Sequence, residues 1–231
     1  MKYASQAERT YILPVIKLPS LINETYKQPI MKLSHHILLI ICLLIAACGD
    51  KPQLSPLNQD AVILAFGDSL THGTGAKPDE SYPAILETLS GRKVINAGIP
   101  GEESEQGLQR LSGLLEKHRP ALLILCHGGN DILRKKDMKK MESNLREMIR
   151  QAQSNNIPVV MLGVPQFGIF LSPAPVYQEI AGSTGVVFIS DLISDLLKDN
   201  NLKSDTVHPN RDGYHKMAVT IHALLKETGA L

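Results

Sequence analysis

From residue 61 onward, the chain alternates between short apolar runs and longer amphipathic stretches. The first run, residues 61–66, holds six apolar residues in a row and stops at Gly67. A short apolar run that ends at a glycine predicts a strand buried on both faces. Similar runs predict three more strands, at residues 121–126, 157–163 and 185–189, and the pattern Lys-Val-Ile-Asn-Ala predicts another at residues 93–97.

Between these runs, apolar residues recur at the three-to-four-residue spacing of an amphipathic helix. Ser81 and Asp137 are placed to cap two of the helices. The predicted helices lie at about residues 81–90, 104–118, 137–156 and 209–226. A repeated order of strand and helix is typical of a parallel sheet covered on both faces. We therefore predict a single α/β domain with three layers, α/β/α, over residues 61–231.

The residues before this domain have a different character. Residues 1–30 contain three prolines that would interrupt a helix, and they show no periodic pattern. A mildly basic start at residues 31–36 is followed by an apolar run of eleven residues, 37–47. This run is too short to span a bilayer but suits the core of a signal peptide. We therefore expect translation to start at Met31 and residues 1–30 to be a non-native extension.

The end of the apolar run, Leu-Ile-Ala-Ala-Cys-Gly at residues 44–49, resembles the lipobox of bacterial lipoprotein signals. The resemblance implies a signal peptide at residues 31–47, cleavage before Cys48, and acylation of its thiol and new amino terminus. An ordinary secretory signal followed by a cysteine is the alternative. Residues 48–60 are then the lipidated cysteine and a flexible tether. We expect the protein in the bacterial cell envelope, lipid-anchored to a membrane on its periplasmic or extracytoplasmic side.

Composition narrows the classes of partner. The chain has 24 Lys and Arg against 23 Asp and Glu, a net charge of +1, so no electrostatic feature favours nucleic acid. It has no Trp and only four Phe, which disfavours an aromatic platform for base stacking. Its three cysteines, Cys42, Cys48 and Cys126, suit neither a disulfide framework nor a zinc site. No His, Asp and Glu cluster has metal-ligand spacing, so we expect no metal and no cofactor.

Four polar clusters follow strands or begin helices at the same expected edge of the sheet, where α/β proteins bind ligands. They are Gly-Asp-Ser-Leu at residues 67–70, Asn-Ala-Gly at 96–98, Gly-Gly-Asn-Asp at 128–131 and Asp-Thr-Val-His-Pro at 205–209. Ser69 would need a base, because a free hydroxyl is a poor nucleophile at neutral pH. His208 can supply that base, and Asp205 can hold its other ring nitrogen.

Each of these residues also has a structural explanation. Ser69 can belong to an ordinary turn, and Asn130 can cap the following helix. Asp205 can be a loop acid and His208 a surface residue. His127, which precedes the third cluster, is the strongest rival base, and we expect it to line or buttress the pocket.

Taken together and in this order, the four clusters resemble the SGNH (GDSL) hydrolase family, named after a Ser, Gly, Asn and His in four such blocks. The resemblance implies a flavodoxin-like fold with a parallel five-stranded sheet, and serine esterase activity. It also implies Ser69, Asp205 and His208 as catalytic residues. By the same resemblance, the oxyanion hole consists of the backbone N–H groups of Ser69 and Gly98 and the side-chain amide of Asn130.

Within that family, residues 96–102 and 106–111 look closest to bacterial arylesterases of the thioesterase/lysophospholipase type, which cleave carboxylic esters and acyl thioesters. We therefore expect a monomeric esterase for a small acyl ester or thioester, with the apolar segment 164–176 in one pocket wall. A carbohydrate O-acetyl esterase is the alternative among enzymes. A non-catalytic envelope lipoprotein that uses the fold as a binding module is the alternative outside them.

Overall fold

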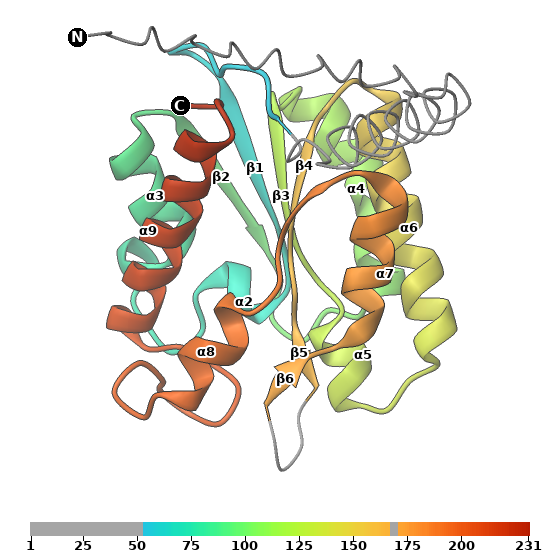
Figure 1. Cartoon of the computed structure of the whole chain (residues 1–231), viewed down its shortest axis with the longest axis vertical. Coiled ribbons are helices and arrows are strands. Elements are labelled where there is room, and N and C mark those ends of the chain that lie inside the picture. Colours follow the sequence, from blue (N-terminus) through green and yellow to red (C-terminus); the bar gives the residue numbers. More distant parts are fainter. Residues whose placement is uncertain (1–52, 167–170) are drawn as a thin grey trace, which may run out of the picture. The chain divides into compact units, whose positions relative to one another are not determined.

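Five parallel strands form the central sheet of the computed structural model, which describes residues 53–166 and 171–231 (Figure 1). The strands are β1 (Val62–Gly67), β2 (Lys93–Gly98), β3 (Leu122–Cys126), β4 (Val159–Leu162) and β7 (Val187–Ile189). Their order across the sheet is β2-β1-β3-β4-β7. Each overlaps a predicted run to within one residue at its carboxyl end, and the predicted parallel sheet is confirmed.

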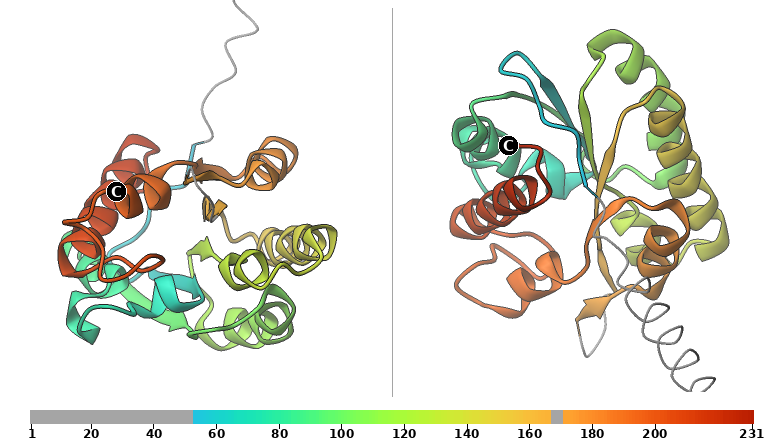
Figure 2. Two further views of the ribbon diagram at one scale, coloured as in Figure 1. Left: turned by 90° about the horizontal axis from the view of Figure 1, so that it is seen from below. Right: turned by 45° about the horizontal axis from the view of Figure 1, so that its top comes forward.

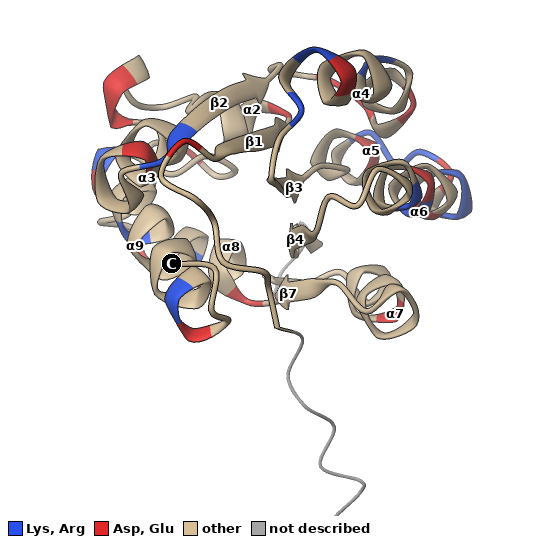
Figure 3. Ribbon diagram, turned by 90° about the horizontal axis from the view of Figure 1, so that it is seen from above, with Lys and Arg blue, Asp and Glu red and all other residues tan. Residues whose placement is uncertain are grey.

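Helices cover both faces of this sheet, so the predicted three-layer α/β/α architecture is confirmed (Figures 1 and 3). One face carries α3 (Tyr82–Ser90), α8 (Leu192–Lys198) and α9 (Arg211–Glu227), and the other carries α4 (Ser104–His118), α6 (Met138–Ser154) and α7 (Pro175–Thr184). The sequence pattern predicted α3, α4, α6 and α9. It missed α8, whose seven residues give only weak periodicity, and α7, whose ten residues include Gly182 and several β-branched residues that are weak helix formers.

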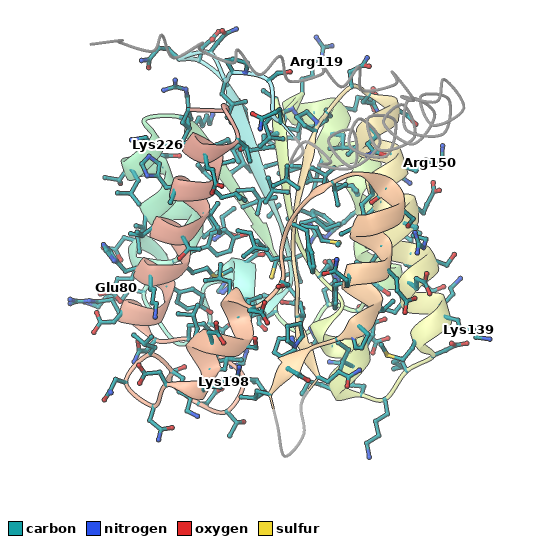
Figure 4. All side chains as sticks on the ribbon, viewed as in Figure 1. Glu80, Arg119, Lys139, Arg150, Lys198 and Lys226 are labelled. Carbon is teal, nitrogen blue, oxygen red and sulfur yellow. The ribbon has the colours of Figure 1, made fainter. Side chains whose placement is uncertain are left out.

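The core lies between the sheet and the two helix layers. Strands β1, β3, β4 and β7 contain no charged residue, as Figure 3 shows, and the side chains of Ile63, Leu64 and Phe66 are fully buried. The apolar face of α6, including Met141 and Leu145, is buried against them. The charged side chains labelled in Figure 4 project from the periphery instead. Burial of the continuous apolar strands on both faces therefore drives this fold.

Short elements gather at the carboxyl edge of the sheet, which lies at the bottom of Figure 1 and faces the viewer in the left panel of Figure 2. They are α2 (Ser69–His72), the 3₁₀ turn η2 (Pro78–Glu80), α5 (Gly129–Leu133) and a small antiparallel hairpin of β5 (Pro165–Gln166) and β6 (Ser172–Pro173). The predicted polar clusters at residues 67–70 and 128–131 lead into α2 and α5, and the cluster at residues 96–98 packs against α2. The fold thereby brings the clusters to one edge, as predicted.

The segment from residue 53 to residue 60 is part of the domain. Leu54 and Leu57 are buried, and their N–H groups donate to the carbonyls of Thr228 and Ala230, each at 2.9 Å. The guanidinium of Arg92 also donates to the Leu57 carbonyl, at 3.1 Å. The prediction of a flexible tether up to residue 60 is therefore wrong for these residues. Two leucines among polar residues cover the core beside the end of α9, a contact that local composition does not reveal.

The predicted extension at residues 1–30, signal peptide at residues 31–47 and lipidated Cys48 lie outside the described residues. Among the residues that are described, no helix is long and apolar enough to cross a membrane. Cys126, at the end of β3, is a free cysteine and is fully buried.

Candidate active site

Ser69 stands at the start of α2, directly after strand β1. The Asp68 carboxylate caps this short helix by accepting a hydrogen bond of 3.1 Å from the Leu70 N–H. Gly67 lets the turn pack against β3, because a Cβ at this position would collide with the Cys126 carbonyl oxygen. The sharp turn from strand to helix thus presents the Ser69 hydroxyl at the carboxyl edge of the sheet.

The predicted nucleophile Ser69, base His208 and acid Asp205 are joined in that order by hydrogen bonds. Ser69 Oγ is 3.0 Å from His208 Nε2, and His208 Nδ1 is 2.7 Å from Asp205 Oδ2. The other carboxylate oxygen of Asp205 accepts hydrogen bonds of 2.8 Å from the N–H groups of Val207 and His208. This arrangement suits a neutral imidazole that donates from Nδ1 to Asp205 and accepts the hydroxyl proton at Nε2.

Two carboxylates of the site have pKa values shifted in opposite directions. For Asp205, burial acts to raise the pKa, but hydrogen bonds from the His208 ring and two backbone N–H groups lower it overall. Asp205 therefore stays charged through the neutral and mildly acidic range. For Asp68, burial dominates and raises the pKa, although His127 and the backbone N–H of Leu70 oppose the shift.

Asn130 lies within α5 and points into the same site. Its Nδ2 donates to the Glu102 carbonyl at 3.0 Å and approaches Asp68 Oδ2 at 3.4 Å. The cap of α5 is Gly128, with φ of 99°, so the explanation of Asn130 as a helix cap does not hold. One amide hydrogen is held firmly, and the second has only a long contact that a stronger acceptor can replace.

Gly98 is not at the site, and its prediction as an oxyanion donor is wrong. Its N–H donates to Asn96 Oδ1 at 3.0 Å, and it is absent from the cavity lining. A Cβ on Gly98 would collide with the backbone of Thr71 and His72. The glycine is therefore needed for the close packing of β2 under α2.

Gly101, three residues further on, occupies the place that sequence reasoning gave to Gly98. It follows Pro100 in a turn closed by a 3.2 Å hydrogen bond from the Glu102 N–H to the Ile99 carbonyl. Its φ of 78° at the third position makes this a type II turn. Gly101 lines the cavity, and its N–H donates to no acceptor within the described residues. The Pro-Gly pair at positions 100 and 101 was the sequence signal for this turn.

A cavity of about 240 Å³ opens beside the Ser69 hydroxyl. Its apolar lining is formed by Leu70, Pro100, Leu133, Val164 and Val207, and its polar lining by Asp68, Ser69, Thr74, Asn130 and His208 together with the backbone of Gly101 and Gly129. The segment 164–176, predicted as a pocket wall, contributes Val164, while residues 167–170 lie outside the described part of the chain.

His127 is the predicted rival base, and it lies behind the cavity. Its side chain is fully buried and is absent from the lining, while Nε2 is 3.0 Å from Glu102 Oε2. It therefore buttresses the site and does not reach the Ser69 hydroxyl. In the two described ranges, no group of three or more His, Cys, Asp or Glu side chains is arranged to hold a metal ion.

Comparison with known proteins defines the class. The sequence profile of the GDSL-like Lipase/Acylhydrolase family matches residues 65–216, and the chain belongs to this family. The Escherichia coli (strain K12) protein named thioesterase 1/protease 1/lysophospholipase L1 is 30% identical over 158 residues, which cover 65% of this chain and 76% of that protein. Esterase TesA of Pseudomonas aeruginosa is 31% identical over 180 residues, which cover 72% of this chain and 89% of that protein.

A solved structure agrees with this assignment. The psychrotrophic esterase EstA from Pseudoalteromonas sp., in a crystal structure inhibited by monoethylphosphonate, superposes with a TM-score of 0.65 at 26% identity. The match covers 73% of this chain and 98% of that one. The predicted membership of the SGNH (GDSL) hydrolases and the predicted fold are therefore confirmed, and the chain is a hydrolase of the GDSL esterase type.

Proposed function

We propose that this protein hydrolyses carboxylic esters and acyl thioesters through an acyl-enzyme intermediate on Ser69. The observation that carries the proposal is the 3.0 Å contact between Ser69 Oγ and His208 Nε2, with Asp205 bound to the opposite ring nitrogen. A base in this position converts a weak hydroxyl nucleophile into an effective one. A module that only bound ligands would have no use for this alignment.

In the acylation step, His208 Nε2 accepts the hydroxyl proton as Ser69 Oγ attacks the substrate carbonyl carbon. Negative charge develops on the carbonyl oxygen, and preorganised donors stabilise it. The donors available at the cavity are the backbone N–H groups of Ser69 and Gly101 and the Asn130 amide. His208 then gives its proton to the leaving alcohol or thiol, and the acyl group remains on Ser69. In the second half-reaction, His208 activates a water molecule that releases the acid.

Asp205 has a supporting role in both half-reactions. Its carboxylate fixes the imidazole with the proton on Nδ1 and stabilises the imidazolium that forms when Nε2 accepts a proton. Its lowered pKa suits this role, since a charged acceptor is needed whenever the ring is charged.

The cavity supports an acyl substrate over an acetylated sugar. Its five apolar lining residues offer a wall for a hydrocarbon chain. Recognition of a sugar would call for several polar groups beyond those used in catalysis. The small volume of about 240 Å³ favours a short acyl chain inside the cavity, with longer chains continuing along the surface.

Substrate profiling tests this assignment. The purified protein would be assayed on p-nitrophenyl esters of graded chain length, on an acyl thioester and on acetylated sugars. We expect the highest kcat/KM on simple acyl esters and thioesters. A clear preference for acetylated sugars would support the carbohydrate O-acetyl esterase alternative.

We further propose that the protein is a monomeric envelope lipoprotein attached to a membrane through Cys48. The proposed catalytic groups all come from one chain, and the lipobox-like residues 44–49 support the anchor. Leu54 lies beside the carboxyl terminus of the chain, at the edge of the sheet opposite the site (Figure 1).

Mass spectrometry of the mature amino terminus tests the anchor. The expected result is an acylated Cys48, with Cys48→Ser unprocessed or released from membranes. An unmodified terminus at another residue would contradict the anchor and leave the esterase assignment intact.

A further inference from the structure

Three charged or titratable side chains meet directly behind the cavity. Arg110 on α4 donates from Nε to Glu102 Oε1 at 2.7 Å and from Nη2 to Glu102 Oε2 at 2.6 Å. The His127 Nε2 is 3.0 Å from the same Oε2. Only 6% of the Glu102 side chain and none of the His127 side chain is exposed. None of the three contacts the proposed nucleophile.

Arg110 also ties two strands together where they end. Its Nη2 donates to the carbonyls of Gly67 at 3.2 Å and Ala97 at 2.9 Å, at the ends of β1 and β2. The guanidinium stacks over the Phe66 ring, 4.1 Å from its centroid. The planar guanidinium fork reaches the carboxylate, both carbonyls and the ring face together, with one of the two Nη2 hydrogens shared between acceptors, whereas a lysine ammonium has no such planar fork.

The backbone of Glu102 connects this cluster to the two donors of the site. Its carbonyl accepts the 3.0 Å hydrogen bond from the Asn130 amide, and its N–H closes the turn that contains Gly101. Any rotation or shift of Glu102 therefore moves both the Gly101 N–H and the Asn130 amide. Arg110 and His127 hold the Glu102 side chain on the side of the turn that faces away from the cavity.

His127, the residue directly after β3, is the third member of the cluster that it forms with Arg110 and Glu102. Its Nδ1 accepts a 2.9 Å hydrogen bond from the Gly128 N–H, so the neutral ring carries its proton on Nε2 and donates it to Glu102. Tyr177 holds the His127 carbonyl at 2.7 Å, and a Cβ on Gly107 would collide with the ring. The ring thus has one position, and it presents one donor.

A buried ion pair is poor evidence for a role in stability, since desolvation offsets much of the attraction. For Glu102, burial acts to raise the pKa, but hydrogen bonds from His127 and Arg110 lower it overall, so the carboxylate stays charged. Because the buried ion pair of Glu102 and Arg110 is not explained by stability, we look for a geometric role for it. The contacts of Glu102 with the turn and with Asn130 provide one.

We propose that Arg110 and Glu102 are positioning residues, which hold the Gly101 N–H and the Asn130 amide in place for the oxyanion, with His127 fixing the Glu102 side chain. This inference rests on the esterase function proposed above. None of the three residues need touch substrate. Loss of the contacts among Arg110, Glu102 and His127 should lower kcat, because misplaced donors stabilise the transition state less, while ground-state binding in the cavity changes little.

The test compares Arg110→Lys with a matched control, Arg92→Lys. Arg92 is also partly buried and donates to backbone carbonyls, those of Leu57 and Ser90, far from the site. We expect Arg110→Lys to lower kcat on a p-nitrophenyl ester by about 10- to 100-fold with KM within about threefold. Arg92→Lys should lower Tm and leave kcat unchanged. Equal kcat in the two variants would overturn the proposal.

A double-mutant cycle with Asn130→Ala separates positioning from simple structural damage. If Arg110 acts through the oxyanion donors, Arg110→Lys should cost several-fold less kcat in the Asn130→Ala background than in the wild-type protein. Equal fold losses in both backgrounds would overturn the proposal. Glu102→Gln, which keeps the side-chain shape, is the variant for the same cycle if Arg110→Lys does not fold.

Phosphonate labelling distinguishes failure of this inference from failure of the proposed function. Wild-type protein that is not labelled at Ser69 contradicts the esterase mechanism itself. Wild-type protein labelled at Ser69, with Arg110→Lys and Glu102→Gln labelled equally fast, contradicts only the positioning role. We expect labelling of both variants to go to completion but to be slowed to about the same extent as kcat.

Discussion

The hydroxyl of Ser69 lies 3.0 Å from Nε2 of His208, although 139 positions separate the two residues in the sequence. Ser69 follows strand β1, and His208 precedes α9, which packs on the same side of the sheet as α3. The contact therefore depends on the whole order of the sheet and not on any local motif. It is the relationship on which the proposed chemistry rests.

We predict that Ser69→Ala and His208→Ala each lower kcat by at least about 10³-fold, because the two groups act in one step. For the same reason, the double variant should be little worse than either single one. Steady-state kinetics on a p-nitrophenyl ester provides the measurement. Independent, multiplicative losses would show that the two residues do not share a step.

Asn130→Ala should lower kcat by about 10²- to 10³-fold, the usual effect of removing one oxyanion donor. KM and Tm should change little, because the Asn130 amide makes one firm bond, to the Glu102 carbonyl, and does not cap α5. Kinetics and thermal unfolding are measured on the same preparation. A large fall in Tm with normal turnover would make Asn130 a structural residue.

The amino-terminal segment should matter for stability. A chain that starts at residue 50 should keep the wild-type Tm and activity, since Leu54 and Leu57 remain buried. A chain that starts at residue 60 loses both side chains, each contributing about 1.5–3 kcal/mol, and should melt roughly 5–15 °C lower. Thermal unfolding checks this. Equal Tm values would show that the segment is a dispensable tether.

Stability should depend on pH through Glu102. Its folded-state pKa is lower than its ordinary value of 4.5, so the charged form stabilises the fold above that pH. This contribution is lost as the pH falls through the folded-state pKa. The difference in free energy of unfolding between wild type and Glu102→Gln should therefore be constant from about pH 7 to 5 and shrink below about pH 4.5.

The control for that series is Glu105→Gln. Glu105 is 64% exposed and lies 3.8 Å from Lys140, a pair that contributes little to stability. Its substitution should leave the unfolding curves close to wild type at each pH. A Glu102→Gln curve that runs parallel to wild type down to about pH 3 would contradict the account of Glu102.

Several features of the fold and site could be predicted from the sequence because they depend on local signals. Apolar runs indicated β1, β3, β4 and β7, a shorter Val-Ile pattern indicated β2, and the polar clusters at residues 67–70 and 205–209 placed Ser69 and His208 at one edge. The burial of Leu54 and Leu57 could not be predicted, because their partners lie at the far end of the chain. Long-range packing of this kind leaves no periodic pattern.

The oxyanion donors show a second limit of sequence reasoning. Gly98 ends a strand and matched the expected position, but its N–H is already bound to Asn96. Gly101 reaches the cavity because the Pro100-Gly101 turn reverses the chain beyond the strand. Likewise, Glu102 and Arg110 were not recognised as site residues, because their contacts join β1, β2 and α4 only in three dimensions.

Covalent labelling by an organophosphonate is the most direct test of the central claim that Ser69 is the nucleophile of an ester hydrolase. Peptide mass spectrometry should find one adduct, on Ser69, formed in parallel with loss of esterase activity. The adduct should be absent from Ser69→Ala and form far more slowly in His208→Ala. An adduct on any other serine, or full inactivation without a Ser69 adduct, would contradict the account.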